Sequence, residues 1–105
     1  MKFGKGWYEM GSKIFLFEIK IKIDEEGKFF GEIFNEKSDL PVAEIIDGTI
    51  KGGVMKFTKI YPQPDDLLRI YYKLSKVTKK TYEGSWMVHY DDLVSISNKT
   101  EITFY

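Results

Sequence analysis

Apolar and polar residues alternate along most of the chain with a repeat of two. The clearest stretch is 15–23, where every odd position is apolar and charged residues occupy positions 18, 20 and 22. A β-strand points successive side chains to opposite faces, so this pattern predicts a strand with one buried face. Residues 67–76 alternate in the same way, and no stretch of helical length has a 3.6-residue repeat. We therefore expect an all-β protein.

Turn-forming residues divide the chain into seven or eight such strands. Residues 24–27 (Asp-Glu-Glu-Gly), 52–53 (Gly-Gly) and 78–80 (Thr-Lys-Lys) predict tight turns, and 62–66 (Pro-Gln-Pro-Asp-Asp) predicts a loop. The strands expected between them are 7–10, 15–23, 29–35, 42–50, 54–61, 67–76, 81–89 and 93–105. The last of these is either one long strand or two strands joined at 97–99.

Short connections between consecutive strands predict an antiparallel up-and-down meander. About eight such strands can close into a barrel, which removes the exposed edges of an open sheet. A two-sheet sandwich is the alternative, but its crossovers need longer connections than most of those in this chain. A length of 105 residues fits one domain, so we expect a single β-barrel over residues 1–105.

The composition argues against several classes of function. The 16 basic and 16 acidic residues give a net charge of zero, which does not favour binding to nucleic acid or to an anionic membrane. Without cysteine there is no disulfide, thiolate metal site or thiol nucleophile. No apolar run approaches the length of a membrane span, and the first residues lack the apolar core of a signal peptide. We expect a cytoplasmic protein.

Several short motifs resemble those of known barrels. Residues 4–8 (Gly-Lys-Gly-Trp-Tyr) resemble the opening Gly-x-Trp of the calycin barrels (lipocalins, fatty-acid-binding proteins and avidins), displaced by one residue. Residues 30–33, 43–50, 55–61 and 82–86 resemble, in their order, a family of small uncharacterised bacterial calycin-like proteins. The resemblance covers roughly residues 28–96 and implies a lipocalin-like or avidin-like barrel. It implies no particular activity.

The alternation also assigns one face of each strand to the barrel interior. The residues expected there are Phe15, Phe17, Ile19, Ile21, Gly31, Ile33, Ile46, Gly48, Ile50, Met55, Phe57, Lys59, Tyr61, Leu68, Ile70, Tyr72, Leu74, Tyr82, Gly84, Trp86 and Val88. An eight-stranded barrel either fills its lumen with side chains or holds one small ligand. The aromatic residues with polar tips favour a site for a small apolar or amphipathic ligand in the barrel mouth. We predict that this site comprises Phe57, Lys59, Tyr61, Tyr72, Tyr82 and Trp86.

Lys59 is the one cation that the alternation places on the inner face. An unpaired buried ammonium is costly, so Lys59 should lie near the rim, pair with a carboxylate or contact a ligand anion. An ion pair, with Glu44 or Asp47 as the partner, or a stem that carries the ammonium to the rim, is the favoured interpretation. If Lys59 instead faces an open mouth beside Tyr61 and Tyr72, it would suit a ligand carboxylate.

Other candidate chemistry is sparse. His89 is the only histidine and has no second histidine or cysteine for a metal site, so we expect it at the rim or surface. Arg69 and Tyr71 fall on the outward face, opposite Ile70 and Tyr72. We expect no cofactor, no metal and no catalytic group, and the residues argue against an enzyme without deciding the question.

Large apolar residues also fall on the outer face of the expected strands. They are Ile14, Leu16, Phe30, Phe34, Ile60, Tyr71 and Met87. A patch of such residues on neighbouring strands predicts a homodimer in which barrel packs on barrel. A second hypothesis is therefore a non-catalytic structural or interaction module with a side-chain-filled barrel. A one-residue slip or bulge, which exchanges the two faces of a strand, is the other explanation of the outer apolar residues.

Overall fold

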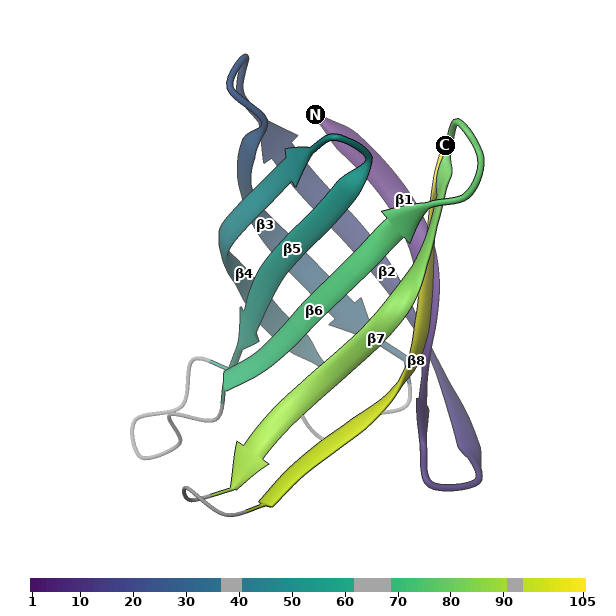
Figure 1. The fold of residues 1–105 in the computed structure, drawn as a ribbon. Helices are drawn as coiled ribbons and strands as arrows, with labels where there is room; N and C mark the ends of the chain where they lie inside the picture. The colour runs from purple at the N-terminus through teal and green to yellow at the C-terminus, as the bar shows by residue number, and fades with distance from the viewer. Residues whose placement is uncertain (37–40, 62–68, 91–93) are drawn as a thin grey trace.

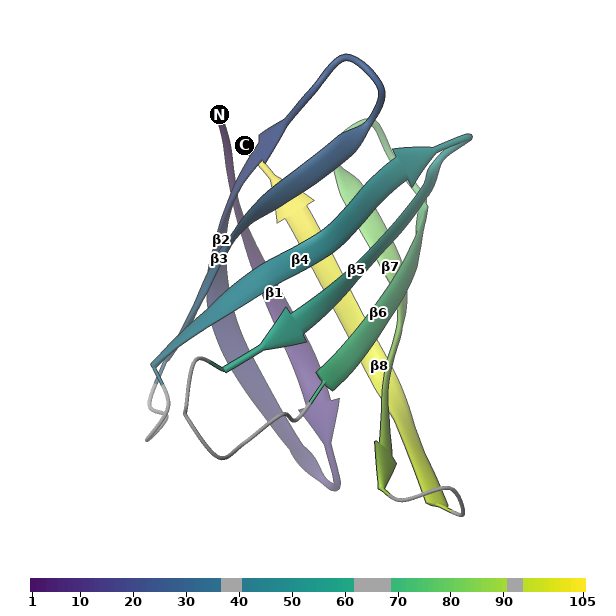
Figure 2. The ribbon, with the colours of Figure 1, turned by 90° about the vertical axis from the view of Figure 1, so that its left-hand side faces the viewer.

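The protein is a closed barrel of eight antiparallel strands (Figure 1). The computed structural model describes residues 1–36, 41–61, 69–90 and 94–105, without the side chains at 89, 90 and 94–96. The strands are β1 (Lys2–Met10), β2 (Lys13–Ile23), β3 (Lys28–Asn35), β4 (Val42–Lys51), β5 (Val54–Ile60), β6 (Arg69–Lys76), β7 (Thr81–Tyr90) and β8 (Val94–Phe104). Each strand pairs with the next, and β1 pairs with β8 to close the sheet (Figure 2).

The predicted all-β, up-and-down barrel is confirmed, although β1 is longer than predicted. β1 begins at Lys2, earlier than predicted, because Gly4 and Gly6 pair with β8 on one side and β2 on the other. The final stretch is one strand that runs through 97–99 without a break in its pairing with β7. The predicted residues 67 and 68 lie outside the described part of the chain. Within that part, no helix is long and apolar enough to span a membrane.

Different turns join the strands at the two ends of the barrel. At the upper end in Figure 1 lie both termini and the turns β2–β3, β4–β5 and β6–β7. Asp24 stabilises the first of these turns, because its Oδ1 accepts hydrogen bonds from the backbone N–H groups of Glu26 (2.8 Å) and Lys28 (2.9 Å). Gly52 and Gly53 form the second with positive φ angles of 57° and 78°, which glycine adopts without strain. At the lower end, β1 and β2 are joined through Gly11 and Ser12.

Alternate residues of most strands point into one apolar core, as the sequence pattern predicts. The described core residues are Phe17, Ile19, Ile21, Phe29, Ile33, Ala43, Ile45, Met55, Phe57, Ile70, Tyr72, Leu74, Tyr82, Trp86, Val88, Ile102 and Phe104. Ile14, Leu16, Phe30, Phe34 and Tyr71 are exposed on the outer face, so their predicted orientation is confirmed.

On β4 the predicted alternation is wrong for the first half of the strand. Ala43 and Ile45 are buried, whereas Ile46, which was expected inside, is only partly buried. The register with β5 shifts between Ile46 and Thr49, and Asp47 has a φ of 54°. A bulge of this kind inserts one residue and exchanges the two faces of the strand. Beyond the bulge the predicted phase holds, and the Phe29 ring packs so closely on Gly48 that a Cβ there would lie 2.6 Å from it.

Candidate functional site

Lys59 lies inside the lower half of the barrel and is the one charged residue among the described buried residues. It stands on β5 between Ile45 of β4 and Ile70 of β6, and only 2% of its surface is exposed. Its Nζ lies 4.7 Å from the ring centroid of Tyr8, 5.5 Å from that of Tyr61 and 5.4 Å from that of Tyr72. An ammonium is attracted to the negative face of an aromatic ring at these distances, so three tyrosines share the cation.

The favoured sequence interpretation of Lys59, an ion pair or a rim-lying ammonium, is wrong. Glu44 and Asp47 are exposed on the outside of β4, whereas the lysine points inward from β5. Across the described residues, the one ion pair is between Lys28 and Glu26 at the surface (3.6 Å). The 2% exposure of Lys59 also leaves no room for an ammonium spread into solvent at the rim. Within the part of the chain that the structure describes, ring faces rather than a carboxylate therefore balance the cation.

Burial sets the ionisation of this cluster. Desolvation lowers the pKa of Lys59 from 10.5 to about 8, because the charged form loses water that the rings replace only in part. Desolvation raises the pKa values of Tyr8, Tyr61 and Tyr72. Repulsion from ionised Tyr61 raises the pKa of Tyr8 further. Repulsion from ionised Tyr8 and Tyr61 does the same for Tyr72. The three phenols therefore stay neutral at physiological pH, and Lys59 is the group whose charge can change there.

The walls around Lys59 are held in place by specific contacts. Asn35 Nδ2 donates a hydrogen bond to Tyr61 Oη at 3.0 Å. Trp86 Nε1 donates to the Glu9 carbonyl at 2.9 Å, which joins β7 to β1, the two strands on either side of β8. The Tyr72 ring stacks on Phe57, with centroids 4.6 Å apart and an interplanar angle of 11°. Such contacts indicate a site whose shape exists before any ligand arrives.

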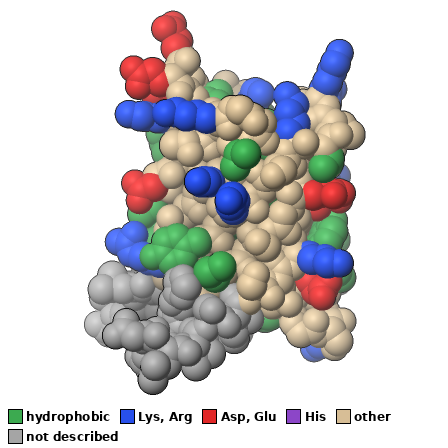
Figure 3. All heavy atoms as spheres, viewed as in Figure 1, with side chains coloured by type: hydrophobic (Ala, Val, Ile, Leu, Met, Phe, Trp, Pro, Cys, Tyr) green, Lys and Arg blue, Asp and Glu red, His purple; other side chains and the backbone are tan. Residues whose placement is uncertain are grey.

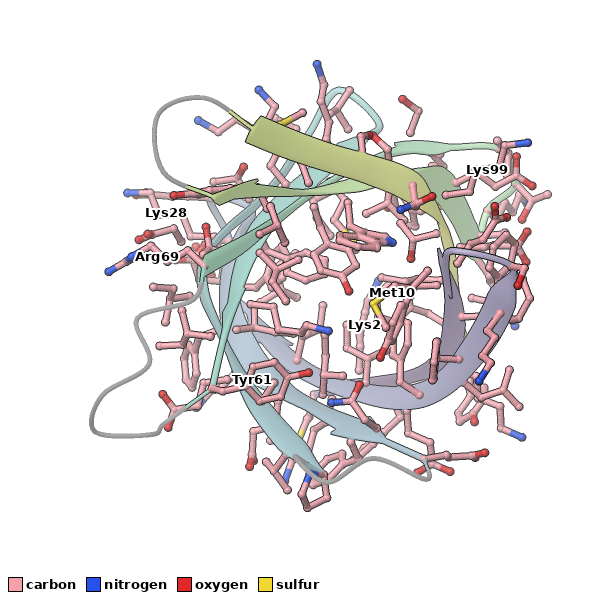
Figure 4. All side chains as sticks on the ribbon, turned by 90° about the horizontal axis from the view of Figure 1, so that it is seen from below. Lys2, Met10, Lys28, Tyr61, Arg69 and Lys99 are labelled. Carbon is pink, nitrogen blue, oxygen red and sulfur yellow. The ribbon has the colours of Figure 1, made fainter. Side chains whose placement is uncertain are left out.

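A cavity of about 190 Å³ opens beside this cluster at the lower end of the barrel. It is lined by Tyr8, Met10, Tyr61, Ile70, Tyr72, Trp86 and Val88. Figure 4 views the barrel from this end, with Met10 and Tyr61 directed toward the lumen. A protein cavity of about 150 Å³ is enough to hold benzene, whereas drug-sized ligands occupy about 300 Å³ or more. The space therefore fits one aromatic ring or a short chain.

The structure brings together four of the six residues predicted for the ligand site. Tyr61, Tyr72 and Trp86 line the cavity, and Lys59 lies behind this lining with its Nζ over the rings of Tyr61 and Tyr72. Phe57 supports the site from behind, because it lies between Tyr72 and the Phe29 ring. Tyr82 belongs to the opposite end of the lumen, where it packs edge-on against Phe104 at 6.1 Å.

Two residues of the cluster were missed from the sequence, although the repeat of two could have found both. Tyr8 continues the inward phase of Gly4 and Gly6 once β1 is extended back to Lys2. Asn35 continues the inward phase of Gly31 and Ile33.

Other candidate groups contribute nothing to this cluster. Arg69 and Tyr71 point outward, as expected. The side chain of His89 lies outside the described part of the structure. Among the described residues, no group of three or more His, Cys, Asp or Glu could hold a metal ion.

Comparison with models of protein families, with curated proteins and with solved structures finds no match to this chain. The eight-stranded antiparallel barrel agrees with calycin-like barrels in general.

Proposed function

We propose that the barrel binds a small amphipathic molecule, about the size of one substituted aromatic ring, in the cavity at its lower end. The apolar part of the ligand would lie against Ile70, Trp86 and Val88, and an acidic group would face Lys59. One observation carries this proposal: a buried ammonium without a carboxylate partner among the described residues shares its tyrosine walls with an adjoining cavity.

The electrostatics of the cluster favour an anionic group on the ligand. A desolvated cation is destabilised relative to water, and ring faces compensate it only in part. A carboxylate beside Lys59 would form a charge-assisted hydrogen bond worth about 1.5–3 kcal/mol. Ligand binding would then reverse the effect of burial and raise the pKa of Lys59. The neutral phenols could donate further hydrogen bonds to the same anion.

A relationship to the calycin barrels is part of the proposal. Its support is the order of short motifs along residues 28–96 together with the up-and-down arrangement of eight strands. Ligand binding inside the lumen is the use that this architecture makes of an incompletely filled barrel.

Trp86 offers a direct test, because it is one of two tryptophans and lines the cavity. In a Trp7→Phe background its fluorescence would report on three probes with the same ring: benzoate, benzyl alcohol and benzylamine. We expect benzoate to bind most tightly and benzylamine least. Lys59→Met should weaken benzoate by about tenfold or more, equivalent to at least about 1.4 kcal/mol. Lys56→Met, on the same strand but exposed, is the matched control.

The proposal fails if none of the three probes changes Trp86 emission, or if benzoate and benzylamine bind equally well.

A homodimeric interaction module is a second candidate, favoured by the outer face of β5, β6 and β7. Tyr71 and Met87 are directly paired there, Tyr71 is 42% exposed, and both line a groove of about 270 Å³ that also contacts Lys56 and Lys73. Figure 3 shows apolar and basic side chains together on this face. Sedimentation over a range of concentrations tests this candidate. We expect a dimer that Tyr71→Ser weakens, and a monomer at the highest concentration would contradict it.

A further inference from the structure

The site around Lys59 supports a chemical role as well as binding. We propose that the Lys59 amine captures a small aldehyde or ketone as a covalent imine inside the barrel. The inference rests on the proposed function in one respect only, since it places the carbonyl compound in the same cavity.

The surroundings of Lys59 leave its amine free to react. Its strand neighbours Ile45 and Ile70 are apolar, and the groups around Nζ are the rings of Tyr8, Tyr61 and Tyr72. A lysine in an ion pair is held as the ammonium, which has no lone pair. Among the described residues no carboxylate holds Lys59 in that form. Lys59 is not itself a lining residue, but the three rings nearest to its Nζ line the cavity, so a compound bound there reaches the amine past these rings.

The ionisation of the cluster supports the same conclusion. With its pKa lowered to about 8, roughly one Lys59 in ten is a neutral amine near pH 7. For an ordinary surface lysine the neutral fraction is below about one in a thousand. Among the described residues, the other titratable groups that face Nζ are Tyr8, Tyr61 and Tyr72, whose raised pKa values keep them uncharged. Desolvation of a lysine in an apolar pocket is a recognised way to activate it as a nucleophile.

The reaction is balanced without an external oxidant or reductant. The nitrogen lone pair forms a bond to the carbonyl carbon, and the C=O π pair moves to oxygen. Oxygen takes up one proton and nitrogen releases one, which gives a carbinolamine. Loss of the hydroxyl group with a second proton from nitrogen then gives the neutral imine and one molecule of water. The cavity, at about 190 Å³, limits the carbonyl compound to about one ring or a short chain.

Reductive trapping of the intact protein tests this role. The protein is incubated with benzaldehyde and cyanoborohydride, which reduces the imine to a stable secondary amine. Each modified site gains the mass of benzaldehyde less one oxygen atom, and peptide mapping locates it. We expect Lys59 to be labelled about tenfold or more faster than Lys56 near pH 7. The rate at Lys59 should rise with pH and level off above about 8.

Two variants and one internal reference make the result specific. Lys59→Arg keeps the charge but removes the nucleophile, so it should abolish the fast labelling. Lys56→Arg removes an exposed lysine from the same strand and should leave the fast labelling unchanged. The α-amine of the chain, whose ordinary pKa also lies near 8, shows the reactivity of a neutral amine without a binding cavity. If Lys59→Arg does not fold, peptide mapping of the labelled wild-type protein still compares the labelling rates of Lys59 and Lys56.

The imine proposal is overturned if Lys59 is labelled no faster than Lys56. A competition experiment separates this failure from failure of the proposed binding function. If benzoate binds but Lys59 is not labelled, the anion site stands and the imine does not. If Lys59 is labelled rapidly and benzoate neither binds nor slows the labelling, the imine stands and the anion site does not.

Discussion

The upper and lower halves of the lumen are built from the same strands but differ in chemistry. On β5, Met55 in the upper half is fully buried among apolar side chains, whereas Lys59 in the lower half is buried among tyrosines. On β6, Leu74 packs into the upper core, whereas Ile70 lines the cavity. A shift of four positions along a strand therefore leads from a packed core to a polar site. The two halves belong to one core, and we propose that the lower half also binds a ligand.

The lower half carries groups that folding alone does not favour. A desolvated lysine and an unfilled space each reduce stability, and neither is needed to close the barrel. Proteins commonly accept such local losses where a ligand is bound. The experiments below test whether the two halves differ in this way.

The largest effect is expected from a cavity made in the upper half. Leu74 is fully buried, so Leu74→Ala should lower the free energy of unfolding by about 2–5 kcal/mol, because it removes apolar contacts that the packed core cannot replace. Val88→Ala, beside the existing cavity, should cost only about 1.5 kcal/mol, close to the transfer cost of the two lost carbon groups. Urea denaturation measures both. Equal losses would contradict the distinction between the halves.

A smaller effect of opposite sign is expected at Lys59. Lys59→Met keeps the unbranched shape and removes the desolvated charge, so it should raise the free energy of unfolding near pH 7 by about 1–3 kcal/mol. The exposed Lys56→Met should change it by less than about 0.5 kcal/mol. A large loss of stability in Lys59→Met alone would show that the ammonium is a structural requirement.

The difference in free energy of unfolding between the wild-type protein and Lys59→Met should depend on pH in a defined direction. Between the folded pKa of about 8 and the unfolded value of 10.5, the unfolded chain binds more protons at Lys59 than the folded chain does. The stability of the wild-type protein should therefore rise relative to Lys59→Met as the pH increases, by about 2 kcal/mol from about pH 7 to about pH 9.5. Comparing the two proteins at each pH cancels the contribution of the tyrosines. A constant difference would mean that burial does not shift the lysine.

The smallest effect is expected from Tyr61→Phe. This change removes the hydroxyl that accepts the hydrogen bond from Asn35 Nδ2 but keeps the ring near Lys59. We expect a loss of about 0.5–1.5 kcal/mol in the free energy of unfolding. Benzoate binding, followed through Trp86, should weaken less than in Lys59→Met. A complete loss of benzoate binding would show that the Tyr61 hydroxyl, rather than Lys59, makes the main contact with the carboxylate.

Most of the fold could be predicted from the repeat of two and the turn residues. Both are local signals: alternation follows from the geometry of a strand, and Gly52 and Gly53 mark a turn by their backbone freedom. The error at Ile46 arose because nothing in the apolar pattern marks the bulge at Asp47.

The candidate site could be predicted only in part, because it depends on how distant strands meet. The inward position of Lys59 follows from its phase along β5, but two of the three rings around its Nζ come from β1 and β6. The absence of an ion pair with Glu44 or Asp47 depends on the bulge and the inward direction of Lys59. Tyr82 shares the inward face with Trp86, but it stands at the start of β7 and therefore lies at the other end of the lumen from Lys59.

The direct test of this account is the pKa of Lys59, measured by NMR titration of lysine side chains in the folded protein. The signal of Lys59 can be assigned by its absence from Lys59→Met, with Lys56→Met as the control. We expect Lys59 to titrate at about 8, well below the usual lysine value of 10.5, and its pKa to rise when benzoate is added. A Lys59 that titrates near 10.5 would contradict the account, because its ammonium would then be solvated or paired.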